Sequence, residues 1–591
     1  MEFIDWGVIA LYFVASIAIG LWYSRRAGRN TQEFFLGGRK MTWWLAGLSM
    51  VATTFAADTP LAVTELVATK GIAGNWLWWN MVIGGMLTVF FFARLWRRSG
   101  VMTDLEIIEL RYSGKPAAFL RGFRALYLGL FLNTVIMGWV NVAMGSILEG
   151  MFGIPHTQVY WYVAGALVFT AVYSSLAGLW GVAVTDAFQF LVAMGGCIVL
   201  AIVVVSSPEV GGIDGLQRAL PAQTFDLLPH VGSLSDGATG VLALSAGAFF
   251  AYIGVQWWAS WYPGAEPGGG GYIAQRMMST KNEQHAVFSV LFFQVAHYCL
   301  RPWPWILVGL ASLVLYPALP LADKKLGFIY AMNDFLPAGL KGLLVAAFFA
   351  AYMSTIATHL NWGTSYLVHD FWRRFVQPGK SEKDYVRISR IATILLMLVS
   401  VAVTPLITSI SGAWQFIIEC GAGLGLVLIL RWYWWRVNAW SEISATALPI
   451  LVYGAIVIRN ALAAPDAQIV FPESLFLTVG LTTVGWILVT YATPPTDDAV
   501  LERFYRKTQP GGALWKPFAV RTGLTTPSMP FLPMFASWAT GIVLVYSILF
   551  GFGKLFFGTG MEVALWFGLS SAAGILLFFL VRSTTRSLPA E

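Results

Sequence analysis

Charged residues are scarce in this sequence: Asp, Glu, Lys and Arg together make up 11% of its 591 residues. An ordinary soluble domain carries roughly one quarter, and 57% of the residues here are hydrophobic. This composition excludes a water-soluble protein. Apolar stretches long enough to cross roughly 30 Å of hydrocarbon recur along the whole chain. They predict an all-α polytopic membrane protein that has the lipid bilayer as its solvent.

Cysteine is also rare. The three cysteines, Cys197, Cys299 and Cys420, all lie in apolar segments. There each is expected to act as a small buried hydrophobic side chain. The number and spacing of the cysteines exclude a disulfide framework and a cysteine-based metal site.

The apolar windows predict about fifteen membrane-spanning helices. They divide the chain into a core of thirteen spans over residues 1–492, a connector over residues 493–533 and two additional spans over residues 534–591. The connector mixes charged and aromatic residues, which is typical of a cytoplasmic segment that lies along the membrane interface. No basic residue precedes the first apolar run, so we expect a retained span and not a cleaved signal peptide.

Lysine and arginine gather in loops that fall on one face of the membrane if the spans alternate. Arg25 and Arg26 follow the first span, and Arg97 and Arg98 follow the third. The positive-inside rule makes this face cytoplasmic. We therefore expect a multi-pass protein of the cell membrane, inner or plasma, with its N-terminus outside and its C-terminus in the cytoplasm. The net charge of +7 then reflects topology, and nucleic acid is not an expected partner.

The second span is interrupted by polar residues at Ala52–Pro60. Pro60 lacks an N–H and clashes with the preceding turn, so the helix is predicted to break just before it and to free backbone carbonyls. Transporters use such breaks to hold ions and substrates near the midplane. Asp58 in this segment is a candidate solute ligand, although a carboxylate there could instead pair with a distant basic side chain.

Two further segments place polar groups at membrane depth. Asp186 starts a long apolar helix after a short turn, where it could bind an ion or simply cap the helix. In the ninth span, Ser354 and Thr358 lie four residues apart on one helical face, with Thr355 beside them. Their hydroxyls suit sodium, a hard cation, although Ser and Thr in membrane helices often bond the carbonyl one turn back.

The eighth span carries His297 and Arg301 one turn apart. Arg301 could bind an anionic or hydroxylated solute, or it could pair with Asp58 or Glu419. The aromatic residues of the seventh span could stack on a sugar or belong to an interfacial belt. The candidates for solute binding are Asp58, Thr59, Gln256, Trp261, His297, Arg301 and Glu419.

The most specific motif runs from Tyr173 to Gln189 and ends in Thr185-Asp186-x-x-Gln189. This run resembles the signature of the sodium:solute symporter family, which includes sodium/galactose, sodium/proline and sodium/glucose symporters. Ala177 stands where the signature has the first glycine of a pair. The segments Glu33–Arg39, Gln275-Arg276 and Ala350–Thr355 support the same resemblance.

The resemblance implies a leucine-transporter (LeuT) type fold with two inverted five-helix repeats, here about residues 43–206 and 241–435. It also implies a sodium site formed by the carbonyls of Ala52, Phe55 and Ala351 with the hydroxyls of Ser354 and Thr355. Some members hold a further ion at positions that correspond to Asp186, Ser354, Ala357 and Thr358. Because Ala357 has no hydroxyl, Asp186 and Thr358 are assigned to a second ion or to the exit path of the first.

The function expected from residues and resemblance together is sodium-coupled import of a small polar solute, with a sugar or polyol ahead of an amino acid or carboxylate. Sodium is the one ion expected, and no enzymatic activity is expected. A transporter-like nutrient receptor and a membrane-embedded enzyme are the alternatives. His297, Arg301 and Glu419 are a thin basis for an enzyme. The sequence does not indicate an oligomeric state.

Overall fold

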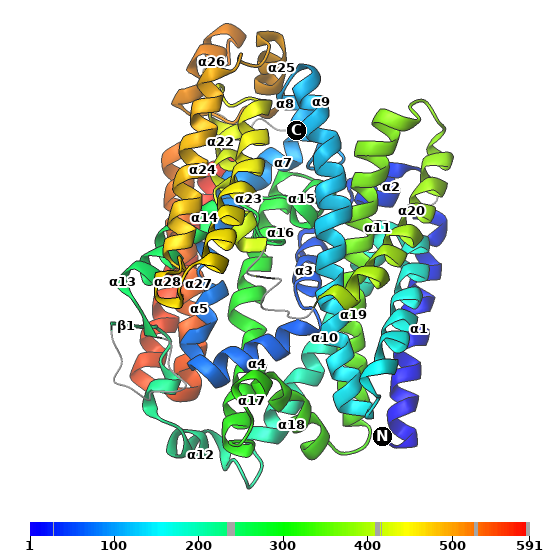
Figure 1. Cartoon of the computed structure of the whole chain (residues 1–591), viewed down its shortest axis with the longest axis vertical. Helices are drawn as coiled ribbons and strands as arrows, with labels where there is room; N and C mark the ends of the chain where they lie inside the picture. The colour runs from blue at the N-terminus through cyan, green and yellow to red at the C-terminus, as the bar shows by residue number, and fades with distance from the viewer. Residues whose placement is uncertain (28, 233–242, 408–413, 415–416, 525–529, 587–591) are drawn as a thin grey trace.

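The computed structural model describes residues 1–27, 29–232, 243–407, 414, 417–524 and 530–586, and nearly all of its regular structure is helical. A short parallel pair, β1 (His230–Val231) and β2 (Ala243–Leu244), is the exception within these residues. The helices stand roughly along the long axis of the molecule (Figure 1). The predicted start of the second repeat, Val241, lies outside the described residues, as do residues 525–529 of the connector.

The first part of the chain forms a bundle around the N-terminal helix and a very long helix, α11. Its elements are α1 (Phe3–Ala27), α2 (Thr31–Leu36), η1 (Gly37–Arg39), α3 (Trp43–Thr53), α4 (Asp58–Lys70), η2 (Ile72–Asn75), α5 (Trp76–Trp79), α6 (Val82–Leu87), η3 (Thr88–Phe92), α7 (Ala93–Ser99), α8 (Glu106–Arg111), α9 (Gly114–Leu126), η4 (Tyr127–Leu132), α10 (Asn133–Phe152), α11 (His156–Val205), α12 (Gly212–Ala219) and η5 (Ala222–Phe225).

The second part centres on α19, which is buried over most of its length and packs against α11, α1, α10 and α20. Its elements are α13 (Ala246–Phe250), η6 (Ala251–Gln256), α14 (Trp257–Ala259), α15 (Gly271–Ser279), α16 (Glu283–Val295), η7 (Ala296–Leu300), α17 (Pro302–Leu315), η8 (Leu321–Leu326), α18 (Gly327–Phe335), α19 (Leu340–Ser365), η9 (Tyr366–Val376), α20 (Glu382–Val403), η10 (Thr404–Leu406) and α22 (Leu424–Tyr433).

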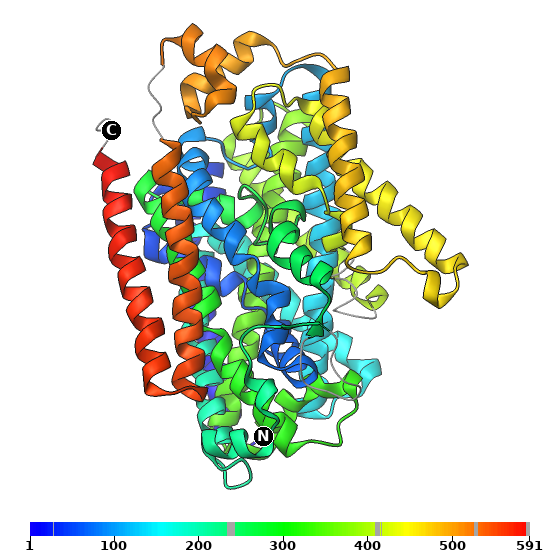
Figure 2. The ribbon, with the colours of Figure 1, turned by 90° about the vertical axis from the view of Figure 1, so that its left-hand side faces the viewer.

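The last part adds two pairs of long helices with the connector between them. Its elements are α23 (Ala439–Leu462), η11 (Pro465–Ala467), α24 (Glu473–Ala492), α25 (Asp498–Thr508), η12 (Ala513–Trp515), α26 (Lys516–Thr522), α27 (Phe531–Phe557) and α28 (Gly560–Arg586). The final two helices lie side by side along one flank of the bundle (Figure 2). The connector helices α25 and α26 cover one end of the molecule.

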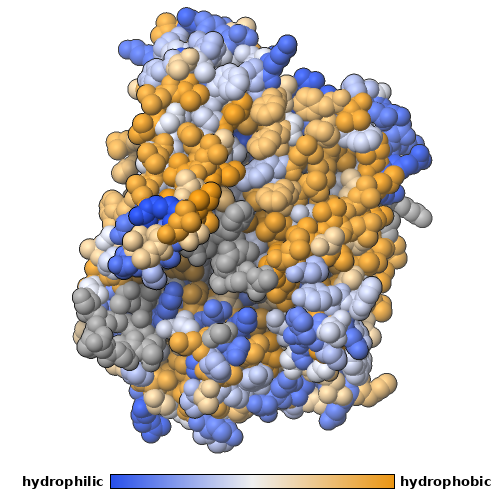
Figure 3. Space-filling model, in the orientation of Figure 1, coloured by the Kyte–Doolittle hydropathy of each residue, from blue (hydrophilic) through white to orange (hydrophobic). Residues whose placement is uncertain are grey.

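Among the described residues, eleven helices are long and apolar enough to cross a membrane. Helices α3 and α22 are apolar but shorter. Helix α11 contains two predicted spans joined at Gly178, where the φ of 59° breaks the helix. The predicted number of about fifteen spans stays a prediction. A hydrophobic band with polar surfaces at both ends is visible on the surface (Figure 3), as expected for a polytopic membrane protein.

Two helices are interrupted in mid-course. Helix α3 ends at Thr53 and α4 begins at Asp58, which confirms the break predicted before Pro60. The second interruption separates α14, which ends at Ala259, from α15, which begins at Gly271. Four glycines in and after this join have positive φ, a conformation that side-chain-bearing residues rarely adopt. Both breaks free backbone groups near the middle of the bundle.

The connector is anchored on the core by Arg111 and Trp515. The guanidinium of Arg111 lies 5.3 Å from the ring centre of Phe504 and 5.0 Å from that of Trp515. The Trp515 indole donates a hydrogen bond of 2.8 Å to the carbonyl of Trp432. These contacts fix the amphipathic segment against α8 and the end of α22.

Candidate functional site

A cavity of about 530 Å³ lies between α4, α5, α10 and the second broken helix. Its wall includes Thr53 and Thr355, next to the break of α3, and it reaches the surface at the exposed Lys70. Besides its tyrosines and tryptophans, the polar and ionisable side chains on its wall are Thr53, Thr54, Asp58, Thr59, Glu65, Thr69, Lys70, Gln256, His297, Arg301, Thr355, His359 and Glu419.

Six of the seven solute-binding candidates line this cavity: Asp58, Thr59, Gln256, His297, Arg301 and Glu419. The seventh, Trp261, does not. Its backbone N–H donates to the carbonyl of Gly421 at 3.2 Å, so Trp261 holds the second break against the segment before α22. The neighbouring Tyr262 faces the cavity in its place.

The guanidinium of Arg301 is already engaged in hydrogen bonds within the protein. Its guanidinium donates to the carbonyl and, at 3.2 Å, to the hydroxyl of Thr54, which lies in the break of α3. It also contacts the carbonyl and the ring of His297, each at 3.2 Å. Within the described part of the chain it forms no direct ion pair with Asp58 or Glu419, the two partners considered from the sequence. The Arg301 guanidinium instead donates to the Thr54 carbonyl, which the helix break leaves without an intrahelical partner.

The sodium candidates lie where α19 meets the end of α3. Thr355 donates its hydroxyl proton to the carbonyl of Thr53 at 2.8 Å, and Ser354 donates to Asp186 at 2.7 Å. Each hydroxyl therefore keeps its lone pairs for another partner. The two hydroxyls and the other three candidates, Ala52, Phe55 and Ala351, are all at most 3% exposed.

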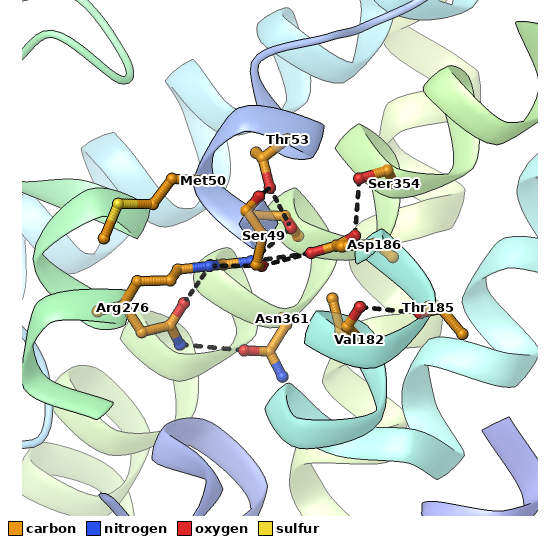
Figure 4. A network of polar contacts seen from close by, with 12 residues as sticks. Ser49, Met50, Thr53, Val182, Thr185, Asp186, Arg276, Ser354 and Asn361 are labelled. Carbon is orange, nitrogen blue, oxygen red and sulfur yellow. Dashed lines mark hydrogen bonds and ion pairs between the residues drawn. The ribbon is translucent and has the colours of Figure 1, made fainter. Parts of the chain in front are cut away.

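Asp186 is the centre of a buried polar network (Figure 4). Its two oxygens accept hydrogen bonds from Ser354 at 2.7 Å and from Ser49 at 2.5 Å. The guanidinium of Arg276 lies 3.7 Å from the same carboxylate and donates to Ser49 at 3.2 Å. Asp186 therefore joins α11, α3, α15 and α19, and the helix-capping role considered from the sequence was wrong.

Thr358, the other candidate for a second ion, is already engaged. Its hydroxyl accepts a hydrogen bond of 2.7 Å from Arg276 and lies 2.9 Å from the hydroxyl of Thr53. Ala357 offers only its carbonyl, which accepts from Ser174 at 3.3 Å. A fixed positive charge thus lies beside both Asp186 and Thr358.

The sequence did not identify the aromatic wall of the cavity. Trp78, Trp139, Tyr252, Tyr298 and Trp414 line it, but aromatic residues in apolar spans look the same whether they face lipid, core or cavity. Arg276 was matched to a family motif without a role. Its spacing from Asp186 along the chain gave no sign that the two side chains meet.

The described residues hold no group of three or more His, Cys, Asp or Glu placed to bind a metal ion. A monovalent hard cation is bound by hydroxyl and carbonyl oxygens, which the junction of α3 and α19 supplies. A helix broken at mid-membrane, buried hydroxyls beside the break and a polar cavity next to it define a secondary transporter.

Comparison with known proteins gives the family. Residues 34–446 match the model of the sodium:solute symporter family, and the chain belongs to this family. It is therefore a multi-pass membrane protein and a sodium-coupled symporter with a leucine-transporter type fold.

Sequence identity to individual relatives is low, but the similarity extends over most of both chains. The sodium/glucose cotransporter of Vibrio parahaemolyticus is 25% identical over 458 residues, 73% of this chain and 81% of the relative. The sodium/myo-inositol cotransporter 2 of Homo sapiens is 26% identical over 542 residues, 84% and 78% of the two chains. A solved outward-open Na⁺-coupled sialic acid symporter has a TM-score of 0.64 at 19% identity, covering 84% of this chain and 99% of its own. This last likeness concerns the fold alone.

Proposed function

We propose that this symporter imports a neutral polyhydroxyl solute, a sugar or polyol, together with one sodium ion. The observation that carries the proposal is that the helix break lies both at the proposed ion site and on the wall of the cavity. Thr53 and Thr355 are hydrogen-bonded to each other across the α3–α19 junction and both line the cavity. Thr355 would bind the ion and also line the solute cavity, so ion and solute would each stabilise the arrangement that the other binds.

The sodium ligands in this proposal are the carbonyls of Ala52, Phe55 and Ala351 with the hydroxyls of Ser354 and Thr355. The donation of both hydroxyl protons to protein acceptors supports it, because the oxygens then face an ion only with lone pairs. Asp186 acts through Ser354, which it orients. Arg276 supplies a resident positive charge beside Thr358, so a second sodium ion is not part of the proposal.

The solute class follows from the electrostatics of the cavity. A carboxylate would need a free cation beside it. Of the Lys and Arg side chains on the wall, Arg301 is committed to Thr54 and His297, and Lys70 lies exposed where the cavity reaches the surface. A sugar would find hydroxyl, carboxylate and amide partners and an aromatic wall against which its C–H faces can pack. Relatives that carry glucose and myo-inositol support this choice.

The orientation that we propose is outward-facing. Helix α4, which lines the cavity and ends at the exposed Lys70, lies on the half of the molecule away from the connector helices α25 and α26 and their basic residues (Figure 1). The positive-inside rule places that connector in the cytoplasm. Sodium entry, driven by roughly 2.3 kcal/mol per charge per 100 mV, would then power uptake from outside.

Uptake into proteoliposomes tests this function. Radiolabelled glucose, myo-inositol, proline and lactate are supplied under an inward sodium gradient, with an equal potassium gradient as the control. We expect sodium-dependent accumulation of a sugar or polyol that collapses when a sodium ionophore dissipates the gradient. Binding without accumulation would favour a nutrient receptor, and chemical conversion of the solute would favour an enzyme. Accumulation of proline or lactate alone would contradict the solute class.

A further inference from the structure

Two buried polar atoms on the cavity wall have no hydrogen-bond partner within the described part of the chain. One is the indole N–H of Trp414, a donor, and the other is Oε2 of Glu419, an acceptor as a carboxylate. Glu419 is only 3% exposed, and its other oxygen accepts a hydrogen bond of 3.2 Å from Ser474. An unsatisfied buried polar group costs about 1 to 3 kcal/mol, so a partner for each atom is expected in the working protein.

The segment that carries Glu419 is held in place by the second helix break. The N–H of Gly423 donates to the carbonyl of Ala259 at 2.9 Å, and the N–H of Trp261 donates to the carbonyl of Gly421 at 3.2 Å. A Cβ on Gly421 would lie 2.7 Å from the carbonyl oxygen of Trp261, so only glycine permits this approach. Glu419 therefore sits on a rigid support, and its free oxygen is not a product of a loosely placed side chain.

The ring of Trp414 is also built into the wall. Its centre lies 6.5 Å from that of Trp139 and 6.3 Å from that of Tyr262, both in edge-to-face geometry. All three side chains line the cavity. An apolar surface of this kind suits the C–H face of a sugar ring, while the indole N–H remains for a polar contact.

An unpaired donor and an unpaired acceptor on the same wall select the chemistry of the ligand. A hydroxyl group both donates and accepts, an ammonium group only donates and a carboxylate only accepts. We infer that Trp414 and Glu419 form a hydroxyl-recognition subsite, in which a solute hydroxyl donates to Glu419 while solute oxygen accepts from Trp414. This inference rests on the proposed function and assigns two specificity-determining residues to it.

Binding of monodeoxy analogues tests the subsite. Affinities of purified protein in sodium buffer are measured by isothermal titration calorimetry for the transported sugar and for each of its deoxy or fluoro-deoxy analogues. The variants are Glu419→Ala and Trp414→Phe, which keeps the aromatic ring but removes the N–H. We expect each to weaken sugar binding about 10-fold or more and to lose discrimination against one particular deoxy position. Sodium affinity, measured with ²²Na⁺, should change less than 3-fold.

Ser444→Ala is the matched control, because the Ser444 hydroxyl donates to carbonyls of its own helix, those of Trp440 at 2.9 Å and Ser441 at 3.1 Å, and Ser444 does not line the cavity. It should change affinity for the sugar less than 3-fold. If wild-type protein binds polyols and both variants keep full discrimination at every hydroxyl position, the subsite is wrong while the proposed function stands. If no polyol binds and the sodium-dependent ligand is an amine or a carboxylate, the solute class and the subsite are both overturned.

Discussion

Substitution of Asp186 by asparagine separates two roles for this buried carboxylate: a charge that acts on a single sodium site through Ser354, or a ligand of a second sodium ion. A hard cation held about 2.4 Å from the Ser354 oxygen would lie about 5 Å from Asp186, because the Ser354–Asp186 hydrogen bond is 2.7 Å long. Coulomb attraction over about 5 Å at an effective dielectric constant of about 20 is roughly 3 kcal/mol. The guanidinium of Arg276, 3.7 Å from the carboxylate, is present in both wild type and D186N, so its own repulsion of the ion cancels in the comparison. We therefore expect D186N to weaken sodium binding by roughly 3 kcal/mol, about 100-fold.

The assay is ²²Na⁺ binding to purified protein as a function of sodium concentration. We expect a Hill coefficient near one for both wild type and D186N, since Asp186 acts on the single site through Ser354. Because D186N leaves Arg276 without its counter-ion, D186N/R276Q serves as the electrically neutral control for folding. A wild-type Hill coefficient near two that falls to one in D186N would refute the reasoning and restore Asp186 as a ligand of a second ion.

Three other substitutions test the structure around the site. Gly363→Ala should lower the unfolding free energy by about 1 to 3 kcal/mol, because the new Cβ would lie 2.7 Å from the Gly129 carbonyl. The control is Gly568→Ala, which has open space around it and should unfold like wild type in the same thermal unfolding assay. Arg301→Lys should weaken sodium binding by about 1 kcal/mol, since a lysine cannot reproduce the contacts to Thr54 and His297; unchanged ²²Na⁺ affinity would contradict its role at the break. Trp515→Ala should cost about 3 kcal/mol of stability, and an equal loss in Leu514→Ala, an exposed neighbour, would show that the connector is not anchored as described.

Local chemistry made the helix break and the neighbouring hydroxyls of α19 predictable. Pro60 and the polar residues around it mark the interruption without any knowledge of neighbours, and helical geometry places Ser354 and Thr358 on one face. The family resemblance supplied the meeting of α19 with α3, which connects residues some 300 positions apart. The contact between Thr355 and Thr53 is consistent with that pairing.

The partners of the buried cations were not predictable from the sequence. The guanidinium of Arg301 donates to the main-chain carbonyl of Thr54, which is free to accept because α3 ends at Thr53. The amino-acid sequence does not reveal which carbonyls are free. The same holds for Trp261, whose backbone N–H donates to the carbonyl of Gly421 in the segment before α22. Cavity walls escape prediction for a related reason, because Trp78 and Tyr298 satisfy the apolar pattern of a span whichever way they face.

The central claim is that the hydroxyls of Ser354 and Thr355 bind the sodium ion that drives solute uptake. The most direct test is ²²Na⁺ binding to purified S354A/T355A protein, with S365A as control. Ser365 lies on the same helix, and its hydroxyl donates to the carbonyl of Trp362 at 2.6 Å. We expect the double variant to lose sodium binding by 100-fold or more, roughly 1.4 kcal/mol or more for each hydroxyl, while S365A binds as wild type. Wild-type sodium affinity in a folded S354A/T355A protein would contradict the account.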